Sequence, residues 1–191
     1  LEASQTAYTK FFFRSRGESF VPGIHHKLID DALRRVESGE IKNLVVTMPP
    51  RFGKTQLGVI DWMGRSIARN PRAKFIHLSY SEELALDNSA KCREQVCSAE
   101  YQDFWPIKLK SDADSKKKWY TEQGGGVYAT AAGGAVTGFG AGSLADIPSA
   151  DQEEVDDEDA RINDEIDAFF ADDGQEALDP DLFYGAIIID D

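Results

Sequence analysis

The amino-acid sequence predicts an α/β domain with a largely parallel β-sheet flanked by helices. Three observations lead to this fold class. Strand-like and helix-like apolar patterns alternate between residues 24 and 98, a Gly-Lys-Thr triplet lies where the first predicted strand meets a helix, and an apolar run at 185–189 ends in two aspartates. Such alternation is typical of parallel sheets, because each crossover helix returns the chain to the start of the next strand. The 191 residues, 41% of them hydrophobic, suffice for one core, so we expect a single domain over 1–191.

The first part of the chain is predicted to contain two helices and one strand. Residues 1–23 mix aromatic and basic side chains and close on a Pro-Gly turn. Residues 24–36 repeat apolar side chains at helical spacing, which predicts an amphipathic helix. Residues 43–48 are a short β-branched run, predicted to be a buried strand, and 54–69 have the spacing of a second helix, which an Asn-Pro pair ends.

The pattern continues through the middle of the chain and ends in a last strand. Residues 74–79 predict a second strand, and 81–98 a helix with a serine cap and two glutamates in its first turn. Residues 118–123 and 127–132 resemble a strand pair around a triple-glycine turn. Residues 185–189 are predicted to add a third buried strand to the sheet.

The acidity of the chain is concentrated in its last quarter. The formal net charge is −13, but residues 143–191 hold 18 of the 34 acidic residues and a single basic one, a net charge of −17. Residues 1–142 carry +4, which permits a phosphate-bearing partner. After a Gly-rich loop at 133–142, we predict that 143–183 is an acidic insertion, mostly loop, with one helix that places four apolar residues on a face: Ile162, Ile166, Phe169 and Phe170.

Composition also excludes several classes of protein. The apolar runs are too short to span a bilayer and the N-terminus carries no secretory leader, so we expect no membrane partner. Cys92 and Cys97 have a spacing that suits neither a zinc site nor a disulfide framework, which favours a reducing cytosol. The chain starts at Leu1 and stops at Asp191 directly after an apolar run, so we expect a fragment cut at both ends.

The segment Met48-Pro49-Pro50-Arg51-Phe52-Gly53-Lys54-Thr55 predicts a phosphate-binding loop. It lies between a predicted strand and a helix, where backbone N–H groups and the helix dipole favour an anion. Lys54 is expected to reach the β- and γ-phosphates of ATP, and the Thr55 hydroxyl to hold Mg²⁺. The loop departs from the usual G-x-x-x-x-G-K-[ST] pattern, because Met48 stands where the first glycine is expected.

The last strand, Ala186-Ile187-Ile188-Ile189-Asp190-Asp191, has the pattern of a Walker B element. A buried strand beside the loop strand brings its C-terminal carboxylates to the metal site. Asp190 is predicted to support Mg²⁺, and Asp191 to orient or deprotonate the attacking water, a role that glutamate fills more often.

Together these motifs resemble the N-terminal ATPase domain of the large terminase subunits of tailed bacteriophages. The resemblance is carried by the loop 49–55, the stretch 20–26, the sequence SYSEELA at 79–85, the Gly-rich stretch 124–140 and the final IIIDD strand. It implies an additional-strand P-loop fold, truncated after the Walker B strand and without the C-terminal nuclease domain. Many relatives carry Arg where Phe139 stands, which leaves the arginine finger unassigned.

The resemblance also implies functions for further residues and partners. Arg51 belongs to the nucleotide site together with Pro50, Phe52, Gly53 and Gln56, and its planar fork suits phosphate oxygens. Two roles are open for one aromatic residue and two histidines, Phe20, His25 and His26. They bind adenine by stacking or by ring-nitrogen hydrogen bonds, or they only pack together and cap a helix. The implied partners are double-stranded DNA, a portal protein and a small terminase subunit, in a homo-oligomeric ring in the host cytoplasm.

Two other functions stay open from the sequence. A small-molecule kinase shares the phosphate loop, but it is expected to carry an acceptor pocket and an Arg-rich lid, and no such lid is visible. A non-hydrolysing nucleotide-binding or DNA-mimicking protein would fit Met48 and the acidic segment. We expect an ATPase that drives double-stranded DNA into a procapsid.

Overall fold

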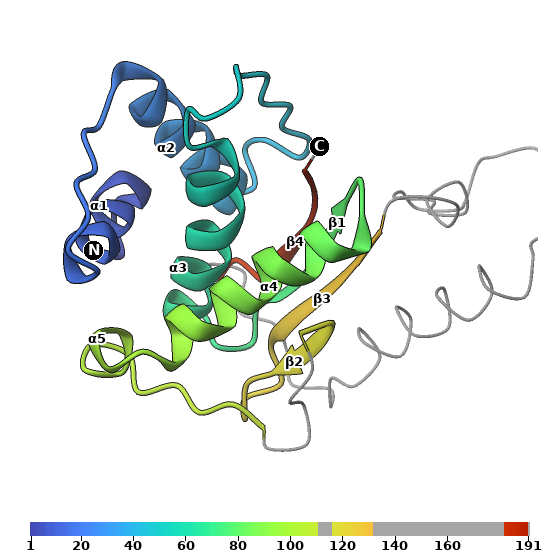
Figure 1. The fold of residues 1–191 in the computed structure, drawn as a ribbon. Helices are drawn as coiled ribbons and strands as arrows, with labels where there is room; N and C mark the ends of the chain where they lie inside the picture. The colour runs from blue at the N-terminus through green and yellow to red at the C-terminus, as the bar shows by residue number, and fades with distance from the viewer. Residues whose placement is uncertain (111–115, 132–181, 191) are drawn as a thin grey trace, which may run out of the picture.

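The described residues contain one sheet of four strands. The structure, a computed structural model, describes residues 1–110, 116–131 and 182–190 (Figure 1). The strand order is β2-β3-β1-β4, with these bounds: β1 Lys74–Ser79, β2 Lys118–Tyr120, β3 Gly126–Ala131 and β4 Gly185–Asp190. β1 pairs in parallel with both β3 and β4, and β2 is antiparallel to β3. The mixed, mostly parallel sheet confirms the predicted α/β class.

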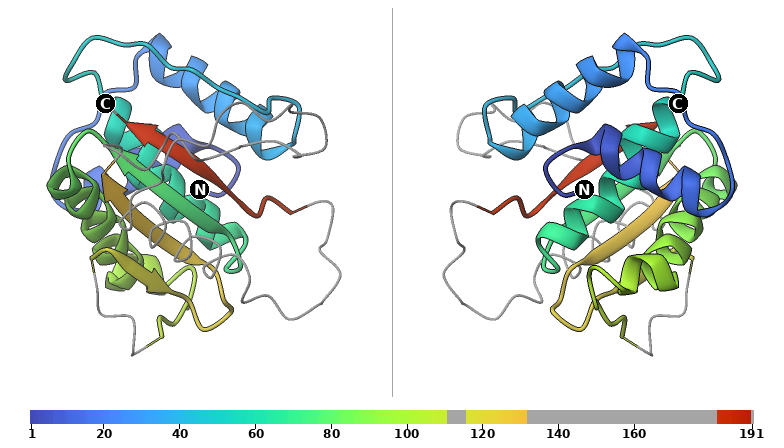
Figure 2. Two further views of the ribbon diagram at one scale, coloured as in Figure 1. Left: turned by 90° about the vertical axis from the view of Figure 1, so that its right-hand side faces the viewer. Right: turned by 90° about the vertical axis from the view of Figure 1, so that its left-hand side faces the viewer.

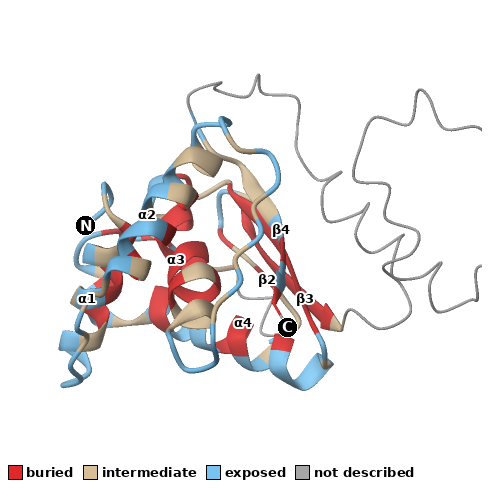
Figure 3. Ribbon diagram, turned by 90° about the horizontal axis from the view of Figure 1, so that it is seen from above, coloured by how far each residue is buried: buried red, intermediate tan, exposed pale blue. Residues whose placement is uncertain are grey.

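The described helices gather on one side of this sheet (Figures 2 and 3). They are α1 Gln5–Ser15, α2 Ile24–Glu37, the π-helical segment η1 Gln56–Ile60 that runs into α3 Asp61–Arg69, α4 Glu82–Cys97 and α5 Ala99–Gln102. Helix α4 contacts β1 and β3, and α1 packs on α3 from outside. No helix among the described residues has both the length and the apolar character that a membrane crossing requires.

The core lies between the sheet and helices α3 and α4. Because side chains alternate across a strand, Phe75, His77 and Ser79 share the face of β1 that points toward the helices. Phe75 packs edge-on against Trp62 of α3, with ring centroids 5.9 Å apart. On β2, Trp119 is fully buried and its indole N–H donates to the Ser89 hydroxyl of α4 at 3.0 Å. Aromatic packing and single hydrogen bonds thus fix both helices on the sheet.

Helix α1 was not predicted from the sequence. Its buried face includes the polar residues Gln5 and Thr9 beside Tyr8 and Phe12, which conceals the apolar period. The helix begins at a Ser4 cap that accepts the Ala7 N–H. Tyr8 and Phe12 are both buried in the core.

The predicted strand at 43–48 is wrong. The segment has no regular secondary structure and no strand partner among the described residues, and β4 is the outermost strand of the described sheet on that side. Val45 is 88% exposed, whereas Leu44 and Val46 pack against the core. Alternate side chains of a segment can be buried and exposed even where its backbone forms no hydrogen-bonded ladder. Side-chain packing then holds the segment in place.

Two further expectations need correction near β4. The strand is half-buried rather than buried, because Ile187 and Ile189 are 45% and 64% exposed. The predicted acidic insertion ends too late, since Phe183 is partly buried and packs against the core. Its ring stacks on Trp62 at 5.6 Å, and its carbonyl accepts the Asn70 side-chain amide at 3.0 Å. The Gly-rich loop 133–142, the predicted helix around Ile162 and the rest of the segment to residue 181 lie outside the described residues.

Candidate functional site

The predicted phosphate loop forms a tight turn that leads directly into a helix. Helical structure begins at Lys54 and continues through η1 into α3, so the N-terminal end of this helix faces the loop. The Leu57 N–H donates to the Gly53 carbonyl at 2.9 Å and closes the first turn. Arg51 and Gly53 both have left-handed backbone, with φ of 68° and 82°. Glycine suits position 53, whereas Arg51 adopts an uncommon conformation for a residue with a side chain.

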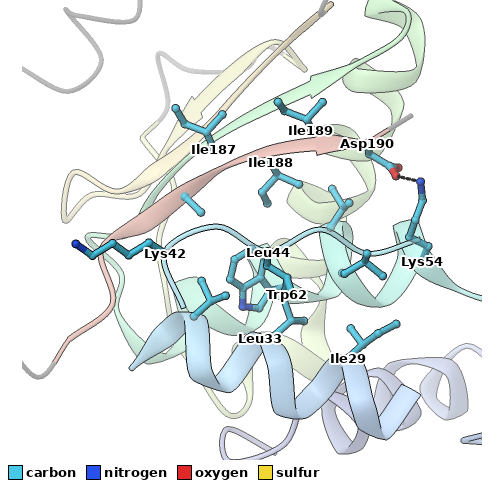
Figure 4. A pocket seen from close by; sticks show the side chains of 15 residues that line it. Ile29, Leu33, Lys42, Leu44, Lys54, Trp62, Ile187, Ile188, Ile189 and Asp190 are labelled. Carbon is cyan, nitrogen blue, oxygen red and sulfur yellow. Dashed lines mark ion pairs between the residues drawn. The ribbon is translucent and has the colours of Figure 1, made fainter. Parts of the chain in front are cut away.

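The loop and the end of β4 bring three polar side chains together. The Thr55 hydroxyl donates to Asp190 Oδ2 at 2.6 Å, and the Lys54 ammonium lies 3.0 Å from Asp190 Oδ1 (Figure 4). The Asp190 side chain is only 10% exposed and that of Lys54 31%. Residues separated by 135 positions in the sequence therefore form one charged, partly desolvated cluster.

Parallel pairing explains why Asp190 reaches this place. β4 runs alongside β1 in register, with Gly185 opposite Lys74 and Asp190 opposite Ser79. The carboxyl ends of the two strands thus lie at the same sheet edge, where parallel α/β sheets place their ligands. Ile188 and Asp190 are the buried residues of β4, which puts the Asp190 carboxylate on the helix side of the sheet.

Two hollows adjoin the cluster. One, of about 450 Å³, is lined by the loop itself, from Met48 through Arg51 to Gln56. The other, of about 180 Å³, lies between α2, the extended segment and β4, and has Lys54 and Asp190 at one end and Lys42 at the other (Figure 4). The second is apolar elsewhere, so only the first offers polar groups on several sides to a charged ligand.

The loop hollow contains most of the residues that the sequence assigned to nucleotide binding. Pro50, Arg51, Gly53, Lys54, Thr55 and Gln56 all line it. Phe52 points elsewhere, since it is 49% exposed and its ring meets that of His25 edge-on at 5.6 Å. Asp191 and Phe139 lie outside the described residues.

The residues proposed for adenine lie beside the loop and pack on one another. Phe20 contacts the rings of Phe13 and His26, with centroids 5.1 Å and 4.8 Å away. His26 is buried and its ring lies against the Phe52 carbonyl, with Nε2 and oxygen 3.2 Å apart. Burial and the neighbouring His25 lower the pKa of His26. The His26 ring caps a helix and contacts the loop. Its position therefore agrees with the second role that the sequence left open, packing and capping.

A buried carboxyl group beside the loop helix was not found from the sequence. Asp61 is fully buried, and its Oδ1 accepts the side-chain amides of Gln56 at 2.8 Å and Gln95 at 2.9 Å. Burial raises the pKa of Asp61. A π-helical turn at 56–60 brings Gln56 and Asp61 together, because its hydrogen bonds join residues five apart. Such a turn carries no sequence signal.

No family model, curated protein or solved structure matches this chain. Its function must therefore be inferred from the residues and the geometry of the site.

Proposed function

We propose that this chain is a P-loop ATPase of the additional-strand type, the N-terminal ATPase domain of a viral large terminase subunit. One observation carries the proposal: Lys54 and Thr55, at the start of a helix, meet Asp190 at the end of a parallel strand. A cation, a hydroxyl and a carboxylate at such a junction are the groups that a phosphate chain with a divalent metal requires.

The residues present fit ATP and Mg²⁺. Thr55 and Asp190 supply two neighbouring oxygen ligands, the kind that Mg²⁺ prefers. Lys54 supplies the charge for the β- and γ-phosphates, and the loop hollow of about 450 Å³ is within the range of small-molecule sites. Bound Mg²⁺ neutralises charge that develops on the phosphate oxygens during transfer.

Binding requires a change of partner at Lys54. Its ammonium is held by Asp190, so a triphosphate must compete with that carboxylate for the same charge. Once Lys54 turns to the phosphates, Asp190 and Thr55 are available to the metal. Arg51, exposed at the loop tip, adds a second cation for phosphate oxygens, and Asp191 positions the attacking water.

The motor function rests on the motif resemblance. The order of the loop, the SYSEELA stretch and the IIIDD strand supports a terminase ATPase that translocates double-stranded DNA into a procapsid. Its proposed partners are DNA, a portal protein, a small terminase subunit and further copies of the chain in a ring, in the host cytoplasm. In such a ring a neighbouring subunit completes each site, so the single chain is expected to turn over slowly.

The test is Mg·ATP binding by calorimetry, compared between wild type and Lys54→Ala. Loss of the Lys54 charge, which is proposed to reach the β- and γ-phosphates, should weaken binding at least tenfold. Lys91→Ala, which removes an exposed lysine paired with Asp87, should leave binding unchanged. Phosphate release is then followed with duplex DNA and, separately, with phosphoryl acceptors. Equal affinity of wild type and Lys54→Ala would contradict the P-loop assignment, and acceptor phosphorylation would favour a kinase.

A further inference from the structure

The ring of His26 bridges the start of α2 and the phosphate loop. The Gly23 N–H donates to His26 Nδ1 at 2.9 Å, and His26 Nε2 lies 3.2 Å from the Phe52 carbonyl oxygen. A carbonyl can only accept and Nδ1 is already an acceptor, so the hydrogen of the neutral ring must be on Nε2. This tautomer follows from the hydrogen-bond partners. One imidazole thus caps a helix and fixes a loop carbonyl.

His25 restricts the protonation state further. Its Nε2 lies 3.1 Å from the Nε2 of His26. Because the His26 nitrogen carries a hydrogen, the His25 nitrogen must present its lone pair. Protonation of His25 would set two N–H groups against each other, and protonation of His26 at Nδ1 would remove the acceptor of the Gly23 N–H. Only two neutral rings satisfy every contact.

The bridged carbonyl belongs to the most constrained part of the loop. Phe52 precedes Gly53, whose φ of 82° sets the turn into Lys54. A Cβ at Gly53 would come 3.2 Å from His26 Nε2, so ring and loop are in close contact. His26 is 6% exposed, and burial together with His25 lowers its pKa, which keeps the ring neutral near pH 7.

Charged groups on the surrounding elements are held by other partners or lie in solvent. They are Lys27 and Asp30 on α2, Arg16 and Glu18 after α1, and Arg51 and Lys54 on the loop. Asp30 accepts hydrogen bonds from the Ser4 hydroxyl and from backbone amides of α1, Arg16 pairs with Glu18, and Lys54 pairs with Asp190. Lys27 and Arg51 are exposed. Two neighbours therefore act on the charge of His26: His25 lowers its pKa, and the hydrogen bond to the Phe52 carbonyl opposes this by raising it.

We propose that His26 is the positioning residue of the phosphate loop, and that with His25 it forms an acid-sensitive latch. Two neutral rings hold the Phe52 carbonyl and the Gly53 turn in the phosphate-binding conformation. A protonated His26 still donates from Nε2 to the Phe52 carbonyl, but its Nδ1–H opposes the Gly23 N–H. A protonated His25 sets its own N–H against that of His26, so either proton displaces the His26 ring that holds the loop. His26 acts through Phe52 and need not touch the nucleotide. The link to nucleotide affinity rests on the proposed function, whereas the link between ring and loop does not.

The first experiment follows the latch without a ligand. NMR spectra of the full chain report the ring nitrogens of its three histidines and the backbone amides of Gly53 and Lys54 between pH 8 and pH 5. We expect the Nε2–H tautomer for His26. The chemical shifts of the loop amides should change with pH at the same midpoint as the protonation of the His26 ring. In His26→Gln this shift should disappear. Glutamine at this third helical position can still accept the Gly23 N–H, so α2 keeps its cap.

The second experiment measures Mg·ATP affinity over the same pH range. At pH values below the midpoint of His26 protonation, the apparent Kd of wild type should rise by up to about tenfold per pH unit, because binding is linked to the loss of one proton. Dividing each value by that of His26→Gln cancels the titration of ATP itself. Whatever its affinity at pH 8, His26→Gln should lack the rise in Kd that wild type shows as the pH falls, and His26→Ala should bind more weakly than wild type at every pH.

The two experiments separate the latch from the nucleotide site. The latch proposal would be contradicted by loop-amide chemical shifts that do not follow the protonation of His26, or by an Nδ1–H tautomer for His26. Equal pH dependence of Kd in wild type and His26→Gln would overturn its role in binding. If neither wild type nor Lys54→Ala binds ATP while the loop amides still follow His26, the proposed function fails and the latch stands.

Discussion

At the scale of single residues, Asp190 controls the state of the site. It accepts the Thr55 hydroxyl and pairs with Lys54, so the groups that the proposed function assigns to metal and phosphate neutralise one another in this structure. A largely desolvated carboxylate requires such partners, because an unpaired buried charge is costly. Under the proposed function, the same contacts have to be exchanged for contacts with Mg·ATP.

Asp190→Asn is expected to remove the metal dependence of nucleotide binding. Asparagine keeps the shape and can accept the Thr55 hydroxyl, but it cannot offer a charged ligand to Mg²⁺. The ratio of Kd values for a fluorescent ATP analogue in EDTA and in Mg²⁺ should fall toward one. Asp87→Asn, which alters an exposed acid on α4, is the control. A wild-type ratio in Asp190→Asn would show that this carboxylate does not hold the metal.

Asp61→Asn is expected to raise stability at neutral pH. Burial raises the pKa of Asp61, so the folded chain keeps a proton that the unfolded chain releases above its pKa of about 3.9. The unfolded state then binds fewer protons, and stability falls as pH rises from there through the folded-state pKa. The difference in Tm, Asp61→Asn minus wild type, should therefore grow between pH 4 and pH 7. A difference that is constant with pH would mean that Asp61 is ionised when buried.

At the scale of elements, β4 depends on the backbone contact at its first residue. Gly185 has φ of 124°, and a Cβ built there would lie 1.6 Å from the Lys74 carbonyl oxygen of β1. Only glycine allows this approach, which sets the register that carries Asp190 to the loop. Gly58, inside the π-helical segment η1, has open space around its Cβ position.

Gly185→Ala and Gly58→Ala should therefore have opposite effects. The first must displace β1 from β4 and should cost well over the ~1 kcal/mol of an average substitution. The second reduces the freedom of the unfolded chain and should stabilise by up to ~1 kcal/mol. Urea unfolding measures both. Equal and small effects would mean that β4 pairs with β1 in another register.

At the scale of the whole molecule, buried polar contacts join the N-terminal helices to the sheet-facing ones. Glu37 at the end of α2 pairs with Arg65 and Arg69 of α3 and accepts the Trp62 indole N–H at 2.7 Å. Phe183, just before β4, stacks on the same Trp62. These contacts thus hold α2, α3 and the residues that lead into β4 together.

Deletion of residues 151–173 is expected to leave this described fold and ATP binding in place. The segment is acidic and poorly patterned, so the sequence predicts an insertion. Tm should change by only a few degrees. Phe183→Ala is the contrast, because removing a core aromatic ring costs up to ~3 kcal/mol at a partly buried position. Unfolding of the deletion variant would show that the segment contributes to the core.

The elements with a regular apolar period could be predicted from the sequence alone. Helices α2 and α4 appear close to their predicted bounds, because each buries one face and local spacing encodes that face. Strand β1 has its predicted bounds as a short run that is buried along its whole length. The start of a helix at Lys54 follows likewise from the Gly-Lys-Thr loop before an apolar repeat. The sequence also named Lys54, Thr55 and Asp190 as members of one site.

Only the tertiary structure decided the contacts that depend on distant partners. The sequence could not show that 43–48 pairs with no strand in the described part of the chain, since strand pairing requires a matching edge as well as β-branched residues. Helix α1 was hidden because part of its buried face is polar. The positions of His26 against Phe52 and of Asp61 between two glutamines were equally invisible, because hydrogen bonds between residues far apart leave no period in the chain.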